Sequence, residues 1–151
     1  MNINGFLARA KKNTYASSSE GSEKILDDGS KELIYEEDGW KYRDRYFGLD
    51  PFIGQEVVWK EDKLVWAMNY YGRTLSNCVP TREVYQFLRK ALKMIKKSSP
   101  FRGPRKFREG DFLYTTTVNQ EAENFIGLEL IFYKHSTVYE LRYHDGLVRN
   151  K

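Results

Sequence analysis

The sequence predicts an α+β fold, in which a bent, mostly antiparallel sheet of six or seven strands, barrel-like in its curvature, carries one long and one short helix. Seven segments rich in β-branched and aromatic residues are separated by Gly, Pro or charged turns, which is typical of strands. Two other segments have the apolar spacing of amphipathic helices. The links between consecutive strands are too short for the crossovers that parallel strands need, so we expect antiparallel pairing.

A short N-terminal helix is predicted over roughly residues 3–12. Ile3, Phe6, Leu7 and Ala10 recur at helical spacing and form one apolar stripe. The stretch that follows is rich in Ser, Gly and Asp and has no apolar periodicity. We therefore expect a long surface loop over residues 15–32.

The long amphipathic helix is predicted over about residues 81–97. Thr81 suits the N-cap position, and Glu83 lies in the first turn, where the helix dipole favours a negative charge. Lysines occupy the expected last turn, and Pro100 follows it. The apolar stripe of this helix consists of Val84, Phe87, Leu88, Ala91, Leu92 and Ile95.

The predicted strands form two groups, four before the long helix and three after it. A loop rich in Pro and Gly, residues 100–111, connects that helix to the second group. The seven predicted strands span residues 33–37, 40–48, 53–60, 63–73, 111–118, 124–134 and 137–146.

Length and composition predict a single domain over residues 1–151. The chain is 40% hydrophobic and 15% aromatic, which is enough apolar surface for a core without disulfides. Cys78 is the single cysteine, so an internal disulfide is excluded and a reducing compartment is expected. The sequence contains neither a signal-peptide core nor an apolar run long enough for a membrane span. We therefore expect a cytoplasmic protein without a membrane partner.

Basic residues are concentrated between Arg82 and Arg108. This segment holds ten basic residues against one acid, whereas the whole chain has a net charge of +4. Binding of a nucleic acid or an acidic partner is one alternative function, but no helix-turn-helix, RNA-binding or zinc pattern accompanies the segment, and we favour a solvated surface. The basic surface would comprise Arg89, Lys93, Lys96, Lys97, Arg102 and Arg105.

Strand register predicts where the polar side chains of the first hairpin point. If residues 60–63 form its turn, Gln55 faces Met68 and Gly54 faces Asn69. Glu56 and Asn69 then share a face of small residues, away from Trp66. Space beside convergent polar groups is what a ligand pocket needs.

The same reasoning applied to the second hairpin pairs Glu129 with Arg142 on its polar face. In the strand over residues 40–48, Asp44 shares one side with aromatic residues, where burial would raise its pKa. The proposed ligand-binding set is therefore Tyr42, Asp44, Tyr46, Glu56, Trp66, Asn69, Tyr70, Glu129 and Arg142.

Two other interpretations of these polar residues remain. Most of them would be solvent-facing, with Glu129 and Arg142 forming a weak cross-strand ion pair, or Asp44 and Glu56 would serve a small enzyme as acid and base. No nucleophile, phosphate-loop or dinucleotide motif is present, and the two histidines and one cysteine lack metal-ligand spacing. We expect no metal and no cofactor, and an unidentified small molecule as the partner.

Several motifs resemble an uncharacterised bacterial domain family of unknown function, which often forms the C-terminal part of XRE-type helix-turn-helix regulators. The resemblance implies an autonomous module with a binding or sensory role, and it supplies no activity. Because no helix-turn-helix precedes these motifs here, we expect a stand-alone module and do not transfer DNA binding. The motifs are FLARAKKNTYA, the D-x-Y-x-G of Asp44, Tyr46 and Gly48, the F-x-G-x-E of Phe52, Gly54 and Glu56, WAMNYYGR, PFRGP and YELRYHDG.

Overall fold

The computed structural model describes residues 2–14, 23–75, 77–121 and 124–151. In these ranges the chain forms a nine-stranded antiparallel sheet and two helices, α1 (Ile3–Asn13) and α2 (Thr81–Leu92). The strands are β1 (Lys24–Ile25), β2 (Lys31–Glu37), β3 (Trp40–Gly48), β4 (Phe52–Lys60), β5 (Lys63–Thr74), β6 (Lys106–Glu109), β7 (Phe112–Glu121), β8 (Asn124–Tyr133) and β9 (Ser136–Leu147).

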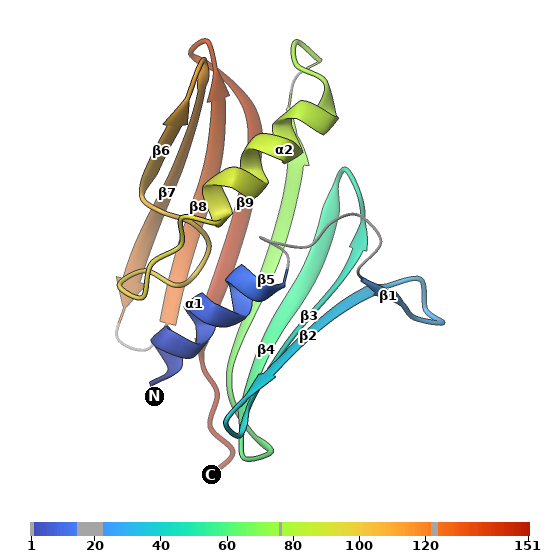
Figure 1. Ribbon diagram of the computed structural model, residues 1–151, viewed down its shortest axis with the longest axis vertical. Coiled ribbons are helices and arrows are strands. Elements are labelled where there is room, and N and C mark those ends of the chain that lie inside the picture. The colour runs from blue at the N-terminus through green and yellow to red at the C-terminus, as the bar shows by residue number, and fades with distance from the viewer. Residues whose placement is uncertain (1, 15–22, 76, 122–123) are drawn as a thin grey trace.

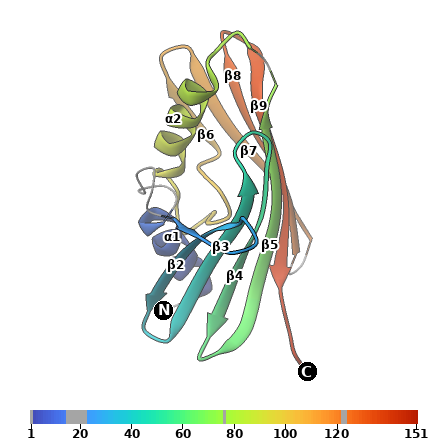
Figure 2. The ribbon, with the colours of Figure 1, turned by 90° about the vertical axis from the view of Figure 1, so that its right-hand side faces the viewer.

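The strand order is β1-β2-β3-β4-β5-β9-β8-β7-β6, so β5 and β9 join two antiparallel meanders. Both helices lie on the same face of the sheet, here called the inner face (Figures 1 and 2). The other face, the outer face, is not covered by either helix (Figure 2). Side chains alternate across each strand, so every second residue of a strand is placed under the helices.

The α+β class and the antiparallel pairing are as predicted, but the sheet is open and has nine strands instead of six or seven. The two additional strands, β1 and β6, are short and occupy the two edges. They lie in segments that the sequence presented as loops, because two to four residues are too few to show periodicity. Residues 15–22 of the predicted long loop lie outside the described residues.

Helix α2 is shorter than predicted, ending at Leu92 instead of residue 97. Beyond it the backbone closes tighter turns, with the Met94 and Ile95 amides donating to the carbonyls of Ala91 and Leu92 at 3.0 and 3.2 Å. Ile95 is still buried, so the buried apolar stripe continues beyond the C-terminal end of the helix. The N-cap position is held by Pro80, whereas the sequence favoured Thr81.

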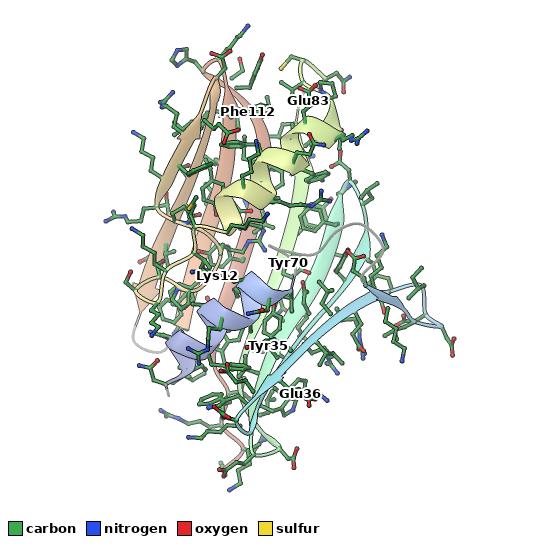
Figure 3. All side chains as sticks on the ribbon, viewed as in Figure 1. Lys12, Tyr35, Glu36, Tyr70, Glu83 and Phe112 are labelled. Atoms are coloured by element: carbon green, nitrogen blue, oxygen red, sulfur yellow. The ribbon has the colours of Figure 1, made fainter. Side chains whose placement is uncertain are left out.

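The core lies between the inner face and the helices, and it contains large aromatic side chains from both halves of the sheet. Trp66, Tyr42, Tyr114, Tyr139 and Tyr143 are each at most 2% exposed. Figure 3 labels Tyr70 of β5 and Phe112 of β7, two rings that contribute to this interior. Close packing of these large rings sets the distance between the sheet and the helices.

Gly127 provides space for one of these rings, and its replacement by alanine is expected to destabilise the protein by about 1–3 kcal/mol. A Cβ atom at this position would lie 1.9 Å from Cζ of Tyr143, so the ring or strand β8 must move. The control is Ile126→Ala on the outer face, where the side chain is 64% exposed. Thermal unfolding measures both, and equal shifts in Tm would contradict the packing described.

Candidate functional site

Carboxyl groups gather on the inner face of the sheet because of strand register. Asp44 of β3 lies opposite Glu56 of β4, Glu56 lies opposite Met68 of β5, and Met68 lies opposite Asp145 of β9. One row of the sheet thus carries three acidic side chains under the helices. Glu129 of β8 is a fourth acid on this face, opposite Leu141.

Lys11 of α1 neutralises Glu56. Its Nζ lies 3.0 Å from Oε2 of Glu56, and both side chains are fully buried. Glu56 Oε2 has no partner of hydrogen-bond geometry, so this contact is electrostatic, while Lys11 donates its hydrogen bond to the carbonyl oxygen of Phe101. Tyr42 donates to the other oxygen of Glu56. Burial lowers the pKa of Lys11, and Glu56 opposes that change.

Arg102 neutralises Glu129 in the same way. Its Nε and NH2 groups donate to the two oxygens of Glu129 at 3.1 and 3.0 Å, in a bidentate pair that is at most 5% exposed. Tyr114 and Tyr139 donate to the same carboxylate. Glu129 is therefore a fully satisfied structural anion that ties the connection after α2 to strand β8.

Asp44 and Asp145 have no cation within ion-pair distance among the described residues. Tyr70 donates to Asp44 Oδ1 at 2.6 Å, and the Trp66 indole donates to Asp145 Oδ2 at 3.1 Å. Burial is the main cause that raises the pKa of each carboxyl to about 7, and the charge of Glu56 contributes to this increase. Each is thus poised to bind or release a proton near neutral pH.

The protein is expected to be less stable at pH 8 than at pH 5. Because the pKa of Asp44 and of Asp145 in the folded state, about 7, exceeds the unfolded value of roughly 3.9, the folded state holds more protons between these values. The free energy of unfolding then falls as pH rises through this window. For each of the two carboxyls, the decrease is up to roughly 1.4 kcal/mol per pH unit. Urea unfolding from pH 5 to 8 measures it.

In this experiment Asp145→Asn should flatten the pH profile. Stability that increases between pH 5 and pH 8 would contradict the assignment of both carboxyls.

The two unpaired carboxyls differ in access. Asp145 Oδ1 is a fully buried atom without a hydrogen-bond partner. Asp44 Oδ2 also accepts no hydrogen bond from the described residues. Unlike Asp145 Oδ1, however, it is not a fully buried atom, and Asp44 lines a pocket. Oδ2 is therefore the atom that Asp44 presents to this pocket.

The pocket has a volume of about 150 Å³ and opens between the inner face and helix α2. Strands β3 to β5 supply one side and the helix supplies another, while Arg102 enters from the connection after the helix. The lining residues are Glu23, Asp44, Tyr46, Gly48, Leu49, Phe52, Tyr70, Tyr85, Leu88, Arg89, Leu92 and Arg102.

The pocket contains three of the nine residues in the ligand-binding set predicted from sequence, namely Asp44, Tyr46 and Tyr70. Four other members of the set also lie on the inner face. Glu56 and Glu129 are buried carboxyls, Tyr42 donates a hydrogen bond to Glu56, and Trp66 belongs to the core and donates to Asp145.

Asn69 and Arg142 lie on the outer face. The prediction that Glu56 and Asn69 share a face away from Trp66 is wrong, because Glu56 pairs with Met68 while Asn69 pairs with Gln55. Gln55 Nε2 donates to Asn69 Oδ1 at 2.9 Å, an exposed contact between neighbouring strands.

The predicted ion pair between Glu129 and Arg142 is also wrong. Arg142 contacts Glu140 at 3.1 Å on the outer face, whereas Glu129 is bound by Arg102 on the inner face.

The structure divides the predicted basic surface. Arg102 is buried and Arg89 lines the pocket, so these two side chains are not part of a common external patch. The other four members, Lys93, Lys96, Lys97 and Arg105, are exposed.

Sequence reasoning missed Lys11 and Asp145, although each had a signal. Lys11 follows Leu7 by four residues, which places it on the apolar stripe of α1 and predicts burial. Asp145 has the same parity as Leu141 and Tyr143, and so shares their face of β9. Neither an apolar stripe nor a strand parity predicts the partner of a buried charge.

No group of His, Cys, Asp and Glu side chains in the described ranges could hold a metal ion. Neither described helix is long and apolar enough to cross a membrane. Cys78 is exposed and forms no disulfide.

Comparison with known proteins identifies one family. Neither the curated proteins nor the solved structures include a match to the chain. Residues 44–148 match the family described as Domain of unknown function (DUF5680), and this match spans most of the sheet together with helix α2 and the pocket residues from Asp44 to Arg102. Because it covers more than half of the sequence, the chain belongs to the DUF5680 family.

Proposed function

We propose that the protein is a small-molecule binding or sensory module whose ligand occupies the pocket beneath α2. The observation that carries this proposal is the open carboxyl of Asp44, which is 4% exposed and has one oxygen free of hydrogen bonds from the described residues. Such a group gains most from a ligand that satisfies it, because an unmatched buried polar atom is costly.

The walls of the pocket suit a ligand with both apolar and polar parts. Leu49, Leu88 and Leu92 line it together with aromatic rings, and its charged residues are Glu23, Asp44, Arg89 and Arg102. This combination is typical of small-molecule sites, in which apolar surface supplies affinity and a few polar groups fix orientation. A volume of about 150 Å³ corresponds to a compact ligand, since an engineered cavity of that size holds benzene.

A thermal-shift screen of metabolites against wild type and Asp44→Asn tests the proposal. A ligand that binds the folded state raises its stability by mass action, by about 2.7 kcal/mol at one hundred times its Kd. We expect compounds that raise the Tm of wild type and lose most of that effect in Asp44→Asn.

Asn69→Ala is the matched control, because Asn69 is a polar residue of β5 that points away from the pocket. Hits should stabilise this variant as they stabilise wild type. Compounds that stabilise all three proteins equally, or a library of amines, acids and neutral polar molecules without any hit, would contradict the proposed site.

A further inference from the structure

The buried charges of the inner face do not balance. Among the described residues, the buried side chains of Asp, Glu, Lys and Arg comprise four carboxyls and two cations, Lys11 and Arg102. Each cation is paired with one glutamate. Asp44 and Asp145 remain without a cation, and of these Asp44 alone lines the pocket. A ligand in the pocket can therefore supply a positive charge that the interior lacks.

Four aromatic residues line the pocket together with Asp44. Phe52 lies between Tyr70 and Tyr85, with ring-centroid distances of 5.9 and 6.1 Å. Tyr46 also lines the pocket. Aromatic rings attract cations through the negative potential of their faces, and the attraction is strongest where water is excluded. Rings beside an open carboxyl are suited to an ammonium group.

Arg89 adds a second charged group with an unmet requirement. It lies on α2, is half-buried, lines the same pocket and makes no hydrogen bond or ion pair in the described part of the chain. The other guanidinium of the pocket, Arg102, is already held by Glu129. Arg89 is therefore the cation left for an anionic group of the ligand.

Asp44 and Arg89 line the same pocket as Tyr46. Both influence the pKa of Tyr46, which is raised mainly by burial, then by Glu23 and Asp44, while Arg89 opposes the increase. Tyr46 donates a hydrogen bond to Glu23 at 3.0 Å. Asp44, Tyr46 and Arg89 all line this pocket, and the Asp44 side chain is more deeply buried than that of Arg89.

We propose that the ligand is a small ammonium–carboxylate zwitterion of the amino-acid type, with its ammonium group on Asp44 and its carboxylate on Arg89. This inference rests on the proposed small-molecule site and specifies its ligand class. The volume of the pocket restricts the ligand to a short side chain, which would pack against Leu88 and Leu92.

Two matched sets of compounds test the ligand class by isothermal titration calorimetry. The first set is leucine, isopentylamine and 4-methylpentanoate, and the second is valine, isobutylamine and 3-methylbutanoate. In each set the amine lacks the carboxylate and the acid lacks the ammonium group. We expect the amino acid to bind roughly tenfold or more tightly than either analogue, as loss of one charged hydrogen-bonding group predicts.

Variants assign the two groups. Asp44→Asn should weaken the amino acid and the amine roughly tenfold or more, whereas Arg89→Gln should weaken the amino acid and leave the amine unchanged. Two variants serve as controls. Asp145→Asn removes the buried aspartate that does not line the pocket, and Arg82→Gln removes an exposed arginine of α2, the helix that carries Arg89. Both control variants should bind the amino acid as wild type does.

The pH dependence provides a second readout. Because the ammonium of an amino acid stays protonated below pH 8, its affinity should increase from pH 5.5 to pH 8 as Asp44 ionises, and Asp44→Asn should remove this increase.

The outcomes separate this inference from the proposed function. If amines bind as tightly as amino acids and Arg89→Gln has no effect, the ligand is not a zwitterion, but the pocket remains the binding site. The ligand class is also wrong, and the pocket also remains the binding site, if neither set of compounds binds while other compounds bind wild type but not Asp44→Asn. If no compound depends on Asp44, both the ligand class and the proposed function are wrong.

Discussion

Replacing Lys11 with methionine is expected to lower the free energy of unfolding by about 3–5 kcal/mol. Lys11 and Glu56 are both fully buried, with Nζ 3.0 Å from Oε2. Without the ammonium group, Glu56 keeps a hydrogen bond from Tyr42 but has no counter-ion within ion-pair distance in the described part of the chain. Urea unfolding followed by circular dichroism measures the loss.

Lys12→Met is the matched control, because Lys12 is the next residue of α1 and is exposed (Figure 3). Its effect should stay within about 0.5 kcal/mol. Adding Glu56→Gln to Lys11→Met should recover part of the stability, since the unpaired charge is then removed. Equal effects of the two single lysine variants would show that Lys11 is not a buried counter-ion.

Replacing Arg102 with methionine is expected to cost a similar amount, about 3–5 kcal/mol, because it strands the carboxylate of Glu129 in the interior. Glu129 is fully buried and receives two hydrogen bonds from Arg102. The hydroxyls of Tyr114 and Tyr139 remain as donors, but they carry no charge. Chemical unfolding at pH 7 is the appropriate measurement.

Arg105→Met, three positions further along the chain, is the control for Arg102→Met because Arg105 is exposed. It should leave the free energy of unfolding within about 0.5 kcal/mol of wild type. If both arginine variants lost the same stability, a change in the backbone conformation of the connection after α2 would explain the result better than an unpaired buried charge.

The positions of most elements were predictable because each has a strong local signal. The first helix and the seven longer strands lie close to their predicted bounds. The placement of Tyr42, Asp44 and Tyr46 on one side of β3 was predicted as well, because it depends only on alternation within one strand. Local periodicity is sufficient for such statements.

The residue register between paired strands was not predictable, because it depends on two β-bulges. In β5, Val65 is an extra residue between the pairs Val58–Trp66 and Trp59–Leu64. A shift of one residue moves every side chain of the partner strand to the other face, which is why Asn69 does not share a face with Glu56.

The second bulge has the same effect in the second hairpin. Val138 is extra between the pairs Ile131–Tyr139 and Phe132–Thr137. The bulge places Glu129 beneath the helices with Tyr139 and Leu141. The position of the turn, which closes with the pair Tyr133–Ser136, also contributes to the loss of the pairing with Arg142. Bulges have no periodic signature in the sequence, so the composition of the candidate site could be predicted only in part.

Asp44 is one of two buried carboxyls without a cation among the described residues, and it is the one that lines the pocket. The most direct measurement is a pH titration of the Asp44 side-chain carboxyl carbon by NMR, with and without leucine. The structure predicts a midpoint near 7 without ligand and a lower midpoint when the ammonium group is bound. Asp145 should keep its midpoint near 7 in both samples. An Asp44 midpoint near 4 in both samples would contradict the account.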